Sequence, residues 1–416
     1  MLTELREREF ARLGDHAYLD YTGAALYGAS QLRAHQALLA SGVFGNPHSD
    51  SETSRASSEI LENARRRVLE FFDVDESTHD VVFTANTTAA IKLVAESYPF
   101  SPETSCVLSA DNHNSVNGIR EYARRAGADV RVLPLDHDLR LDHPLDHLGS
   151  GPGLLAFPAQ SNFSGVRHPL SLVAAARSRG FAVLVDVAAF VPSHALSLRE
   201  CPADFVALSF YKLFGYPTGV GALIARHDSL AKLRRPWFSG GTIEYVSVAD
   251  GTHELKLGHE SFEDGTTNFL AIAALEPGFA LLDEVKMLRL SAHVCKLTHI
   301  LLGELAAMSH VTVYGPLDCS GRGGTVAFNV DGVPYTEVER RAREAGVSLR
   351  GGCFCNPGAA EHAFEFVANA ESRGNIGAVR VSVGLANTCA DVERALDVVA
   401  SLSSARGAES KKRALL

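Results

Sequence analysis

The sequence predicts an α/β protein, with a mostly parallel sheet in a large domain and a smaller C-terminal α+β domain. Apolar, β-prone segments alternate with amphipathic helical segments between about residues 80 and 225, a rhythm typical of consecutive βαβ units. Such sheets bind ligands beyond the carboxyl ends of their strands, where several polar residues fall here. We expect the large domain to cover residues 17–285, and residues 1–16 and 286–416 to form the smaller one.

The expected elements follow in order along the chain. Before the sheet, we expect a short helix over 1–16, a strand over 18–20 that leads into a loop of small residues, and an amphipathic helix over 54–72. The strands of the sheet are expected at 80–84, 106–109, 130–133, 154–157, 181–186, 205–209 and 220–225. After helical sequence over 268–305, the smaller domain is expected to contain strands at 324–330, 347–350 and 379–383 and helices at 335–345 and 390–401.

Composition argues against several classes of protein. Of the 416 residues, 46% are hydrophobic and 21% are charged, as in ordinary soluble enzymes. A net charge of −10 spread along the chain argues against nucleic acid as the main partner. No apolar run approaches the ~18 residues of a membrane span, and the charged N-terminus lacks a signal-peptide core. Seven cysteines without framework spacing predict a reducing, cytoplasmic location.

A lysine and an aspartate lie at the ends of two consecutive predicted strands. Lys212 follows the strand 205–209 among Phe, Leu and Gly, where burial lowers the pKa of an amine and suits it to forming a Schiff base. Asp186 ends the strand before it. Pyridoxal phosphate requires this pair, because a lysine holds its aldehyde and a carboxylate keeps its pyridine nitrogen protonated. For Lys212 alone, the alternative is a side chain that extends to solvent from the strand end.

A phosphate site is predicted where a strand passes through Asn86, Thr87 and Thr88 into a helix. The free N–H groups and the dipole of a helix N-terminus attract anions, and threonine hydroxyls add hydrogen bonds. The same residues are common helix caps, so a purely structural turn is the alternative. His113 also follows a strand and is otherwise an ordinary loop histidine. Arg380 lies in an alternating strand, where a structural salt bridge is the competing interpretation.

Two cysteines, Cys353 and Cys355, lie in a glycine-rich segment. A Cys-x-Cys pair can bind a metal, but no second Cys/His pair with ligand spacing accompanies it, so we predict no metal site. The neighbouring glycines would give a reactive thiol freedom to move, and Arg350 would favour its thiolate form.

Several blocks of this sequence resemble the class V aminotransferase superfamily, pyridoxal-phosphate enzymes of fold type I. The resemblance runs from about Tyr18 to Ser401. Within the superfamily it is to cysteine desulfurases, and most of all to the aminotransferase-like domain of molybdenum cofactor sulfurases. The most specific blocks are Tyr18–Asp20 with Gly23–Ala25, Gly45–Ser49, Asp111–Ser115, Ser209–Gly221 and Arg350–Gly358.

The resemblance implies roles for the candidate residues. Lys212 would bind pyridoxal phosphate covalently, Asp186 would pair with its pyridine nitrogen, and His113 would stack on the ring and relay protons. Cys355 would be the nucleophile. The phosphate ligands implied are Thr87, Thr88, Ser209 and, from the neighbouring subunit of a homodimer, Thr266. The ligands implied for the substrate are Arg380, with Asn162 and Arg350.

Three departures from the general desulfurase pattern stand out. Tyr211 occupies the place before the lysine where many members have His, and we assign it to the cofactor site. Ala189 stands three residues after Asp186, where many members have Gln, so the hydrogen bond to the cofactor's ring oxygen is unassigned. Full-length eukaryotic molybdenum cofactor sulfurases also have a further C-terminal domain, and this chain ends where that domain would begin.

The implied reaction converts L-cysteine to L-alanine and leaves a persulfide on Cys355, with molybdenum cofactor as one candidate acceptor of the sulfur. Two alternatives remain. A C–S lyase or a cyclase of the same fold would not need Cys355. A catalytically silent dimeric scaffold is disfavoured because Lys212, Asp186 and Arg380 occur together.

Overall fold

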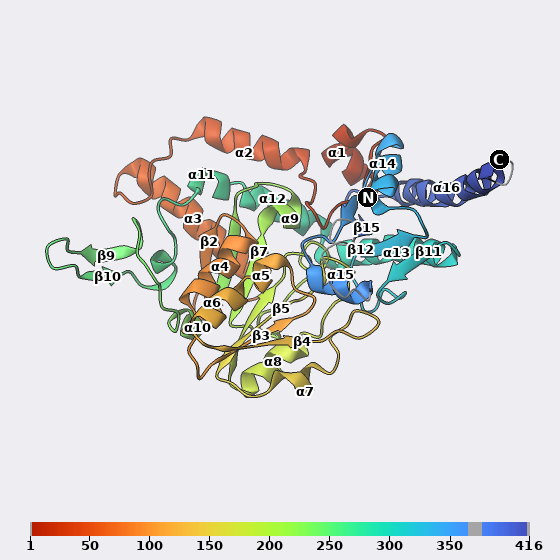
Figure 1. The fold of residues 1–416 in the computed structure, drawn as a ribbon. Coiled ribbons are helices and arrows are strands. Elements are labelled where there is room, and N and C mark those ends of the chain that lie inside the picture. Colours follow the sequence, from red (N-terminus) through yellow and green to blue (C-terminus); the bar gives the residue numbers. More distant parts are fainter. Residues whose placement is uncertain (1, 365–376, 414–416) are drawn as a thin grey trace.

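The computed structural model describes residues 2–364 and 377–413, which contain a seven-stranded sheet flanked by helices and a smaller four-stranded sheet (Figure 1). The large sheet has the order β2 (His79–Thr84), β8 (Gly221–Arg226), β7 (Phe205–Ser209), β6 (Phe181–Asp186), β5 (Gly153–Pro158), β3 (Ser105–Ser109) and β4 (Asp129–Leu133). Neighbouring strands are parallel except at β8, which runs antiparallel to both β2 and β7. The predicted α/β class with a mostly parallel sheet is confirmed.

Helices cover both faces of this sheet. The helices are α1 (Leu2–Glu9), η1 (Ala11–Leu13), α2 (Ala29–Ser41), α3 (Glu52–Phe71), α4 (Thr87–Ser97), α5 (Asn114–Asn117), α6 (Ile119–Arg125), α7 (Pro144–Leu148), α8 (Ser171–Ser178), α9 (Phe210–Phe214), α10 (His227–Leu230), η2 (Gly258–Ser261), α11 (Phe269–Ile272), α12 (Leu275–Val285), α13 (Met287–Ala307), α14 (Tyr335–Glu344), α15 (Pro357–Ala363) and α16 (Cys389–Arg413). Successive side chains of a strand point to opposite faces, so the apolar strands contribute to two cores. Leu108 and Ala156 belong to the core with α4 and α6, whereas Val107 and Leu155 belong to the core with α3, α8 and α12.

The smaller sheet is antiparallel throughout. Its order is β11 (Val311–Tyr314), β12 (Thr325–Val330), β15 (Ala378–Ser382) and β14 (Arg350–Gly352). The strand expected over 347–350 is instead two short strands in different sheets, because β13 (Val347–Ser348) pairs with β1 (Ala17–Tyr18) near the N-terminus. The ion pair between Arg6 and Asp391 also links the N-terminal segment to this region.

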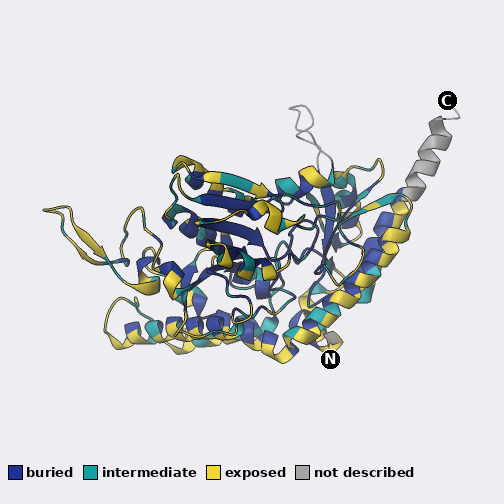
Figure 2. Ribbon diagram, turned by 90° about the horizontal axis from the view of Figure 1, so that it is seen from below, coloured by how far each residue is buried: buried dark blue, intermediate teal, exposed yellow. Residues whose placement is uncertain are grey.

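Several features were not expected from the sequence, among them helix α2 and strand β11. The hairpin β9 (Ile243–Val246) and β10 (His253–Leu255) extends away from the body of the molecule, with most of its residues exposed (Figure 2). The helix α16 continues to Arg413, beyond the expected end near residue 401. In the part of the chain that the structure describes, no helix has both the length and the apolar character needed to cross a membrane.

Candidate active site

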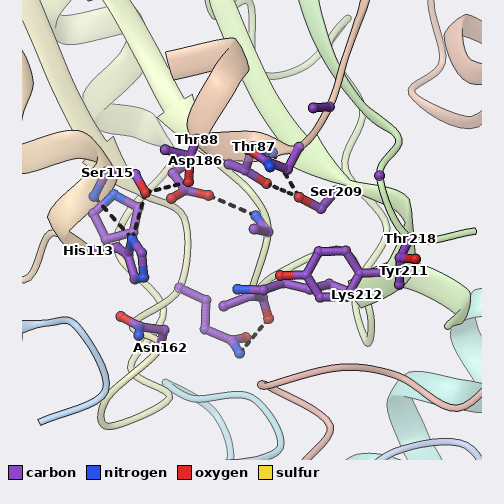
Figure 3. A pocket seen from close by; sticks show the side chains of 17 residues that line it. Thr87, Thr88, His113, Ser115, Asn162, Asp186, Ser209, Tyr211, Lys212 and Thr218 are labelled. Atoms are coloured by element: carbon purple, nitrogen blue, oxygen red, sulfur yellow. Dashed lines mark hydrogen bonds between the residues drawn. The ribbon is translucent and has the colours of Figure 1, made fainter. Parts of the chain in front are cut away.

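A pocket of about 260 Å³ lies at the carboxyl ends of β2, β6 and β7 (Figure 3). These three strands run in the same direction, so the residues that follow them meet at one edge of the sheet. The predicted site residues that line this pocket are Thr87, Thr88, His113, Asn162, Asp186, Ser209, Tyr211 and Lys212. The sequence pattern therefore identified residues that are far apart in the chain and adjacent in space.

Lys212 lies in α9, one short helical turn that begins directly after β7. Burial is the main cause that lowers the pKa of Lys212, and the charges of Arg380 and Arg350 act in the same direction. The carboxylate of Asp186 opposes this shift. A larger share of the amine is therefore neutral near neutral pH than for an exposed lysine, as a Schiff base requires.

Asp186 ends β6, and its side chain is buried. Its Oδ1 accepts a hydrogen bond from the backbone N–H of Ala188 at 2.9 Å, which fixes the orientation of the carboxylate. The same pocket is lined by Ala189 and by Gln160, whose Nε2 donates to the carbonyl of Ala189 at 2.8 Å. The Oε1 atom of Gln160 is buried and has no hydrogen-bond partner among the described residues.

The pocket also has a group of hydroxyls at the N-terminus of α4. The hydroxyls of Thr87 and Ser209 lie 2.7 Å apart, and the backbone N–H of Thr87 donates to the same Ser209 oxygen at 2.8 Å. Thr88 makes a hydroxyl contact of 2.7 Å with Ser115. The side chain of Asn86 caps the helix by accepting from the N–H of Ala89, so the capping role and the hydroxyl cluster coexist.

His113 also lines the pocket. Burial, and secondarily the charge of Lys212, lowers its pKa, so the neutral imidazole predominates near neutral pH. The backbone N–H of Ser115 donates to Nδ1 at 3.1 Å, so in the neutral ring the proton resides on Nε2. Ser115 was not expected in the site, although its position two residues after His113 could have suggested this contact.

Arg380 and Arg350 lie outside the pocket and share one carboxylate. The guanidinium of Arg380 is buried and donates to Asp20 Oδ1 at 2.9 Å and to the carbonyl of Asn162 at 2.9 Å; its Nε has no hydrogen-bond partner among the described residues. Arg350 is half-exposed and donates to Asp20 Oδ2 at 2.7 Å. The pKa of Arg350 is raised, first by the hydrogen bond to Asp20 and in smaller part by the charge of Cys355.

Cys355 is exposed and lies in a loop that contacts the rim of the pocket. Its carbonyl accepts from the N–H of Asn114 at 2.7 Å, and Asn162 donates to the carbonyl of Phe354 at 2.7 Å. Phe354 and Cys355 have φ of 56° and 57°, a left-handed conformation uncommon for residues other than glycine. At least one neighbouring glycine has a packing role, because a Cβ on Gly358 would lie 2.1 Å from the carbonyl of Ala110.

Thr266 lies outside this pocket and lines a second one of about 320 Å³. The two pockets are neighbours, because Ala85 and Gly219 line both of them. The hydroxyl of Thr266 accepts from Asn46 Nδ2 at 3.3 Å. Among the residues that the structure describes, no group of three or more His, Cys, Asp or Glu side chains is arranged to hold a metal ion.

Comparison with known families adds to this geometry. The family model described as aminotransferase class V matches residues 17–395. This chain belongs to the class V aminotransferase family. The match contains every predicted site residue, and the resemblance inferred from the sequence is confirmed. Membership is consistent with the strand-end lysine and aspartate described above.

This class V family member is also similar to named proteins. The molybdenum cofactor sulfurases of Arabidopsis thaliana and Anopheles gambiae are 35% and 38% identical to it, over 96% and 94% of this chain. The chain spans only 58% and 57% of those relatives. A solved structure of a cysteine desulfurase from Thermococcus onnurineus is 26% identical, covers 96% of this chain and 97% of its own, and superposes with a TM-score of 0.86. A cysteine desulfurase from Escherichia coli, 23% identical with a TM-score of 0.82, has the same fold.

Proposed function

We propose that this chain is a pyridoxal-phosphate-dependent cysteine desulfurase that transfers sulfur from L-cysteine to Cys355. One observation carries the proposal: Lys212 and Asp186 line a single pocket, and the loop that bears Cys355 is hydrogen-bonded to residues at its rim. Its relatives among molybdenum cofactor sulfurases and the fold shared with cysteine desulfurases support the same activity.

The residues present fit pyridoxal phosphate. Lys212 supplies an amine for the aldehyde, and Asp186 supplies a carboxylate for the pyridine nitrogen. The hydroxyls of Thr87, Thr88 and Ser209 lie together at the N-terminus of α4, a terminus suited to a phosphate. The pocket volume of about 260 Å³ is near the lower end of small-molecule sites, roughly 300 Å³. When bound, this cofactor supplies an electron sink for chemistry at the substrate's α- and β-carbons.

The other side chains of the site have separate roles in proton transfer and in substrate binding. The amine of Lys212, whose pKa burial lowers, can accept a proton at Nζ in its neutral form, and the Nε2–H of His113 can donate a hydrogen bond. The guanidinium of Arg380, with Asn162 beside it, binds the substrate carboxylate. Tyr211 lines the same pocket and would contact the cofactor there.

Cys355 accepts the sulfur. Its thiolate attacks the sulfur of bound L-cysteine, so an S–S bond forms as the substrate's C–S bond breaks and the carbon skeleton leaves as L-alanine. Arg350 lies close enough to Cys355 for the charges of the two side chains to interact.

We also propose an acceptor for the sulfur, an oligomeric state and a cellular location. Molybdenum cofactor is the proposed acceptor, since the relatives named above are sulfurases of that cofactor. A homodimer is proposed because Thr266 lies outside its own chain's pocket, so that a neighbouring chain could bring it to the phosphate. A cytoplasmic location is proposed because all seven cysteines are free thiols.

The test is the release of L-alanine and sulfide from L-cysteine in the presence of a thiol reductant. We expect wild-type protein to release both, and Cys355→Ala to retain the yellow cofactor but release neither. Equal release by both proteins would contradict the persulfide mechanism and favour a C–S lyase. A protein that binds no cofactor would favour a silent scaffold.

A further inference from the structure

A cluster of buried polar side chains lies behind the pocket, outside the residues to which the function above assigns roles. It consists of Asp111, Ser161, His168 and Asn356, and we refer to it as the Asp111 cluster. None of these four residues is more than 3% exposed. Asp111 follows β3, Ser161 and His168 follow β5, and Asn356 precedes α15. The cluster therefore joins loops of the large sheet to the loop that bears Cys355.

The carboxylate of Asp111 is the centre of the cluster. Its Oδ1 accepts from Ser161 Oγ at 2.7 Å and from Asn356 Nδ2 at 2.7 Å, and its Oδ2 lies 2.7 Å from His168 Nε2. A carboxylate without solvent contact is costly unless it is hydrogen-bonded and paired. Three short contacts meet that requirement, so moving any one of these loops would leave buried groups without partners.

Asn356 connects this carboxylate to the nucleophile's loop. Its Nδ2 also lies 3.1 Å from the carbonyl of Asp111 and 3.0 Å from Asn162 Oδ1, while its Oδ1 caps α15 by accepting from Ala359 N–H at 3.2 Å. Asn356 is the residue directly after Cys355 in the chain. Its side chain therefore holds the backbone directly after Cys355 at the start of α15.

Each protein loop in the cluster bears a residue of the proposed active site. His113 follows Asp111 by two positions, Asn162 follows Ser161 directly, and Cys355 precedes Asn356. A single buried carboxylate thus relates the positions of His113, a substrate ligand and the nucleophile. Small errors in such a relation are costly, since a shift of about 1 Å can slow a reaction by a factor of about 100.

We propose that Asp111 and Asn356 are positioning residues that hold the Cys355 thiol in reach of the substrate's sulfur. This inference rests on the proposed desulfurase function. It assigns to the cluster a role in the sulfur-transfer step, distinct from cofactor binding, because none of its four side chains lines the cofactor pocket.

The first test uses holoenzyme with Asn356→Ala and follows persulfide formation on Cys355 in a single turnover with L-cysteine. We expect sulfur transfer to slow by about tenfold or more, with unchanged cofactor content. The control is Asn387→Ala, which removes another buried asparagine with two hydrogen bonds but lies outside the cluster. It should lower the midpoint of thermal unfolding while leaving the rate of transfer near that of wild type.

A second readout does not require turnover. Hydrogen exchange of the cofactor-free protein should quicken at the amides of Asn114 and Ala359, which donate to Cys355 and Asn356, in Asn356→Ala but not in Asn387→Ala. If Asn356→Ala does not fold, Asn356→Ser keeps an oxygen that can cap α15 and serves for the same measurements.

Rescue distinguishes positioning from general loss of stability. The exchange Asp111→Asn with Asn356→Asp reverses donor and acceptor across the 2.7 Å contact, so the pair should transfer sulfur faster than either single variant. Transfer at the wild-type rate in Asn356→Ala, or an equal loss in Asn387→Ala, would overturn the inference. If wild-type protein forms no persulfide, the proposed function fails instead, and the exchange measurement still decides whether the cluster holds this loop.

Discussion

The Asp20 carboxylate binds the buried guanidinium of Arg380 at 2.9 Å and accepts hydrogen bonds from the half-exposed Arg350 at the same time. Burial lowers the pKa of Arg380, and the charge of Asp20 opposes that shift. Asp20 lies near the N-terminus, whereas both arginines lie in the smaller sheet. The two ion pairs of Asp20 therefore hold the N-terminal segment against Arg380, the residue that we assign to the substrate carboxylate.

Asp20→Asn is predicted to destabilise the cofactor-free protein by about 3 kcal/mol, because removal of one partner leaves a buried charge uncompensated. Denaturant unfolding measures this change. Glu337→Gln is the matched control, since it removes a partly exposed carboxylate that also pairs with two arginines, and it should shift the unfolding midpoint far less. Equal shifts in the two variants would show that Asp20 does not stabilise a buried charge.

Thr87→Val is predicted to weaken the binding of pyridoxal phosphate by about tenfold or more, because a hydrogen bond to a charged group contributes about 1.5–3 kcal/mol. The dissociation constant of the cofactor-free protein, measured from cofactor fluorescence or absorbance, gives the result. Pyridoxal, which lacks the phosphate, is the control ligand. Its affinity should change little, and an equal loss for both ligands would remove Thr87 from the phosphate site.

In the cofactor-free protein, Lys212 is predicted to react with acetic anhydride at lower pH than Lys92. Burial lowers the pKa of Lys212, whereas the hydrogen bond to Glu96 raises that of Lys92, so the neutral amine appears earlier at Lys212 as the pH rises. Asp186→Asn removes a charge that favours the ammonium form, so the Lys212 midpoint should fall further. Mass spectrometry of the two peptides measures both midpoints. A midpoint for Lys212 at or above that of Lys92, or a rise in Asp186→Asn, would contradict this electrostatic description.

Much of the fold and most of the pocket could be predicted from the sequence. The buried parallel strands are continuous apolar runs bounded by polar turns, so Asp186 and Lys212 could be placed at strand ends without coordinates. Strands that run in one direction end at one edge, and this topology brings Thr87, His113 and Asp186 to the same pocket.

The remaining contacts depend on packing between segments that are distant in sequence. Nothing local to Asp111 or Asn356 indicates that their side chains meet, since they are brought together by the docking of the small sheet's loop on the end of β3. The hairpin formed by β9 and β10 was also missed, because its short, exposed strands carry no clear apolar alternation. The shared carboxylate of Asp20 could not be assigned to Arg380 for the same reason, as 360 positions separate the two residues.

Mass spectrometry of the protein after one equivalent of L-cysteine shows whether Cys355 receives the substrate's sulfur. The reaction is run without reductant, and free thiols and persulfides are then alkylated. We expect one additional sulfur atom on the peptide that contains Cys355, at this cysteine and not at Cys353, in an amount that matches the L-alanine formed. Alanine or sulfide formed without any sulfur added at Cys355 would contradict this expectation.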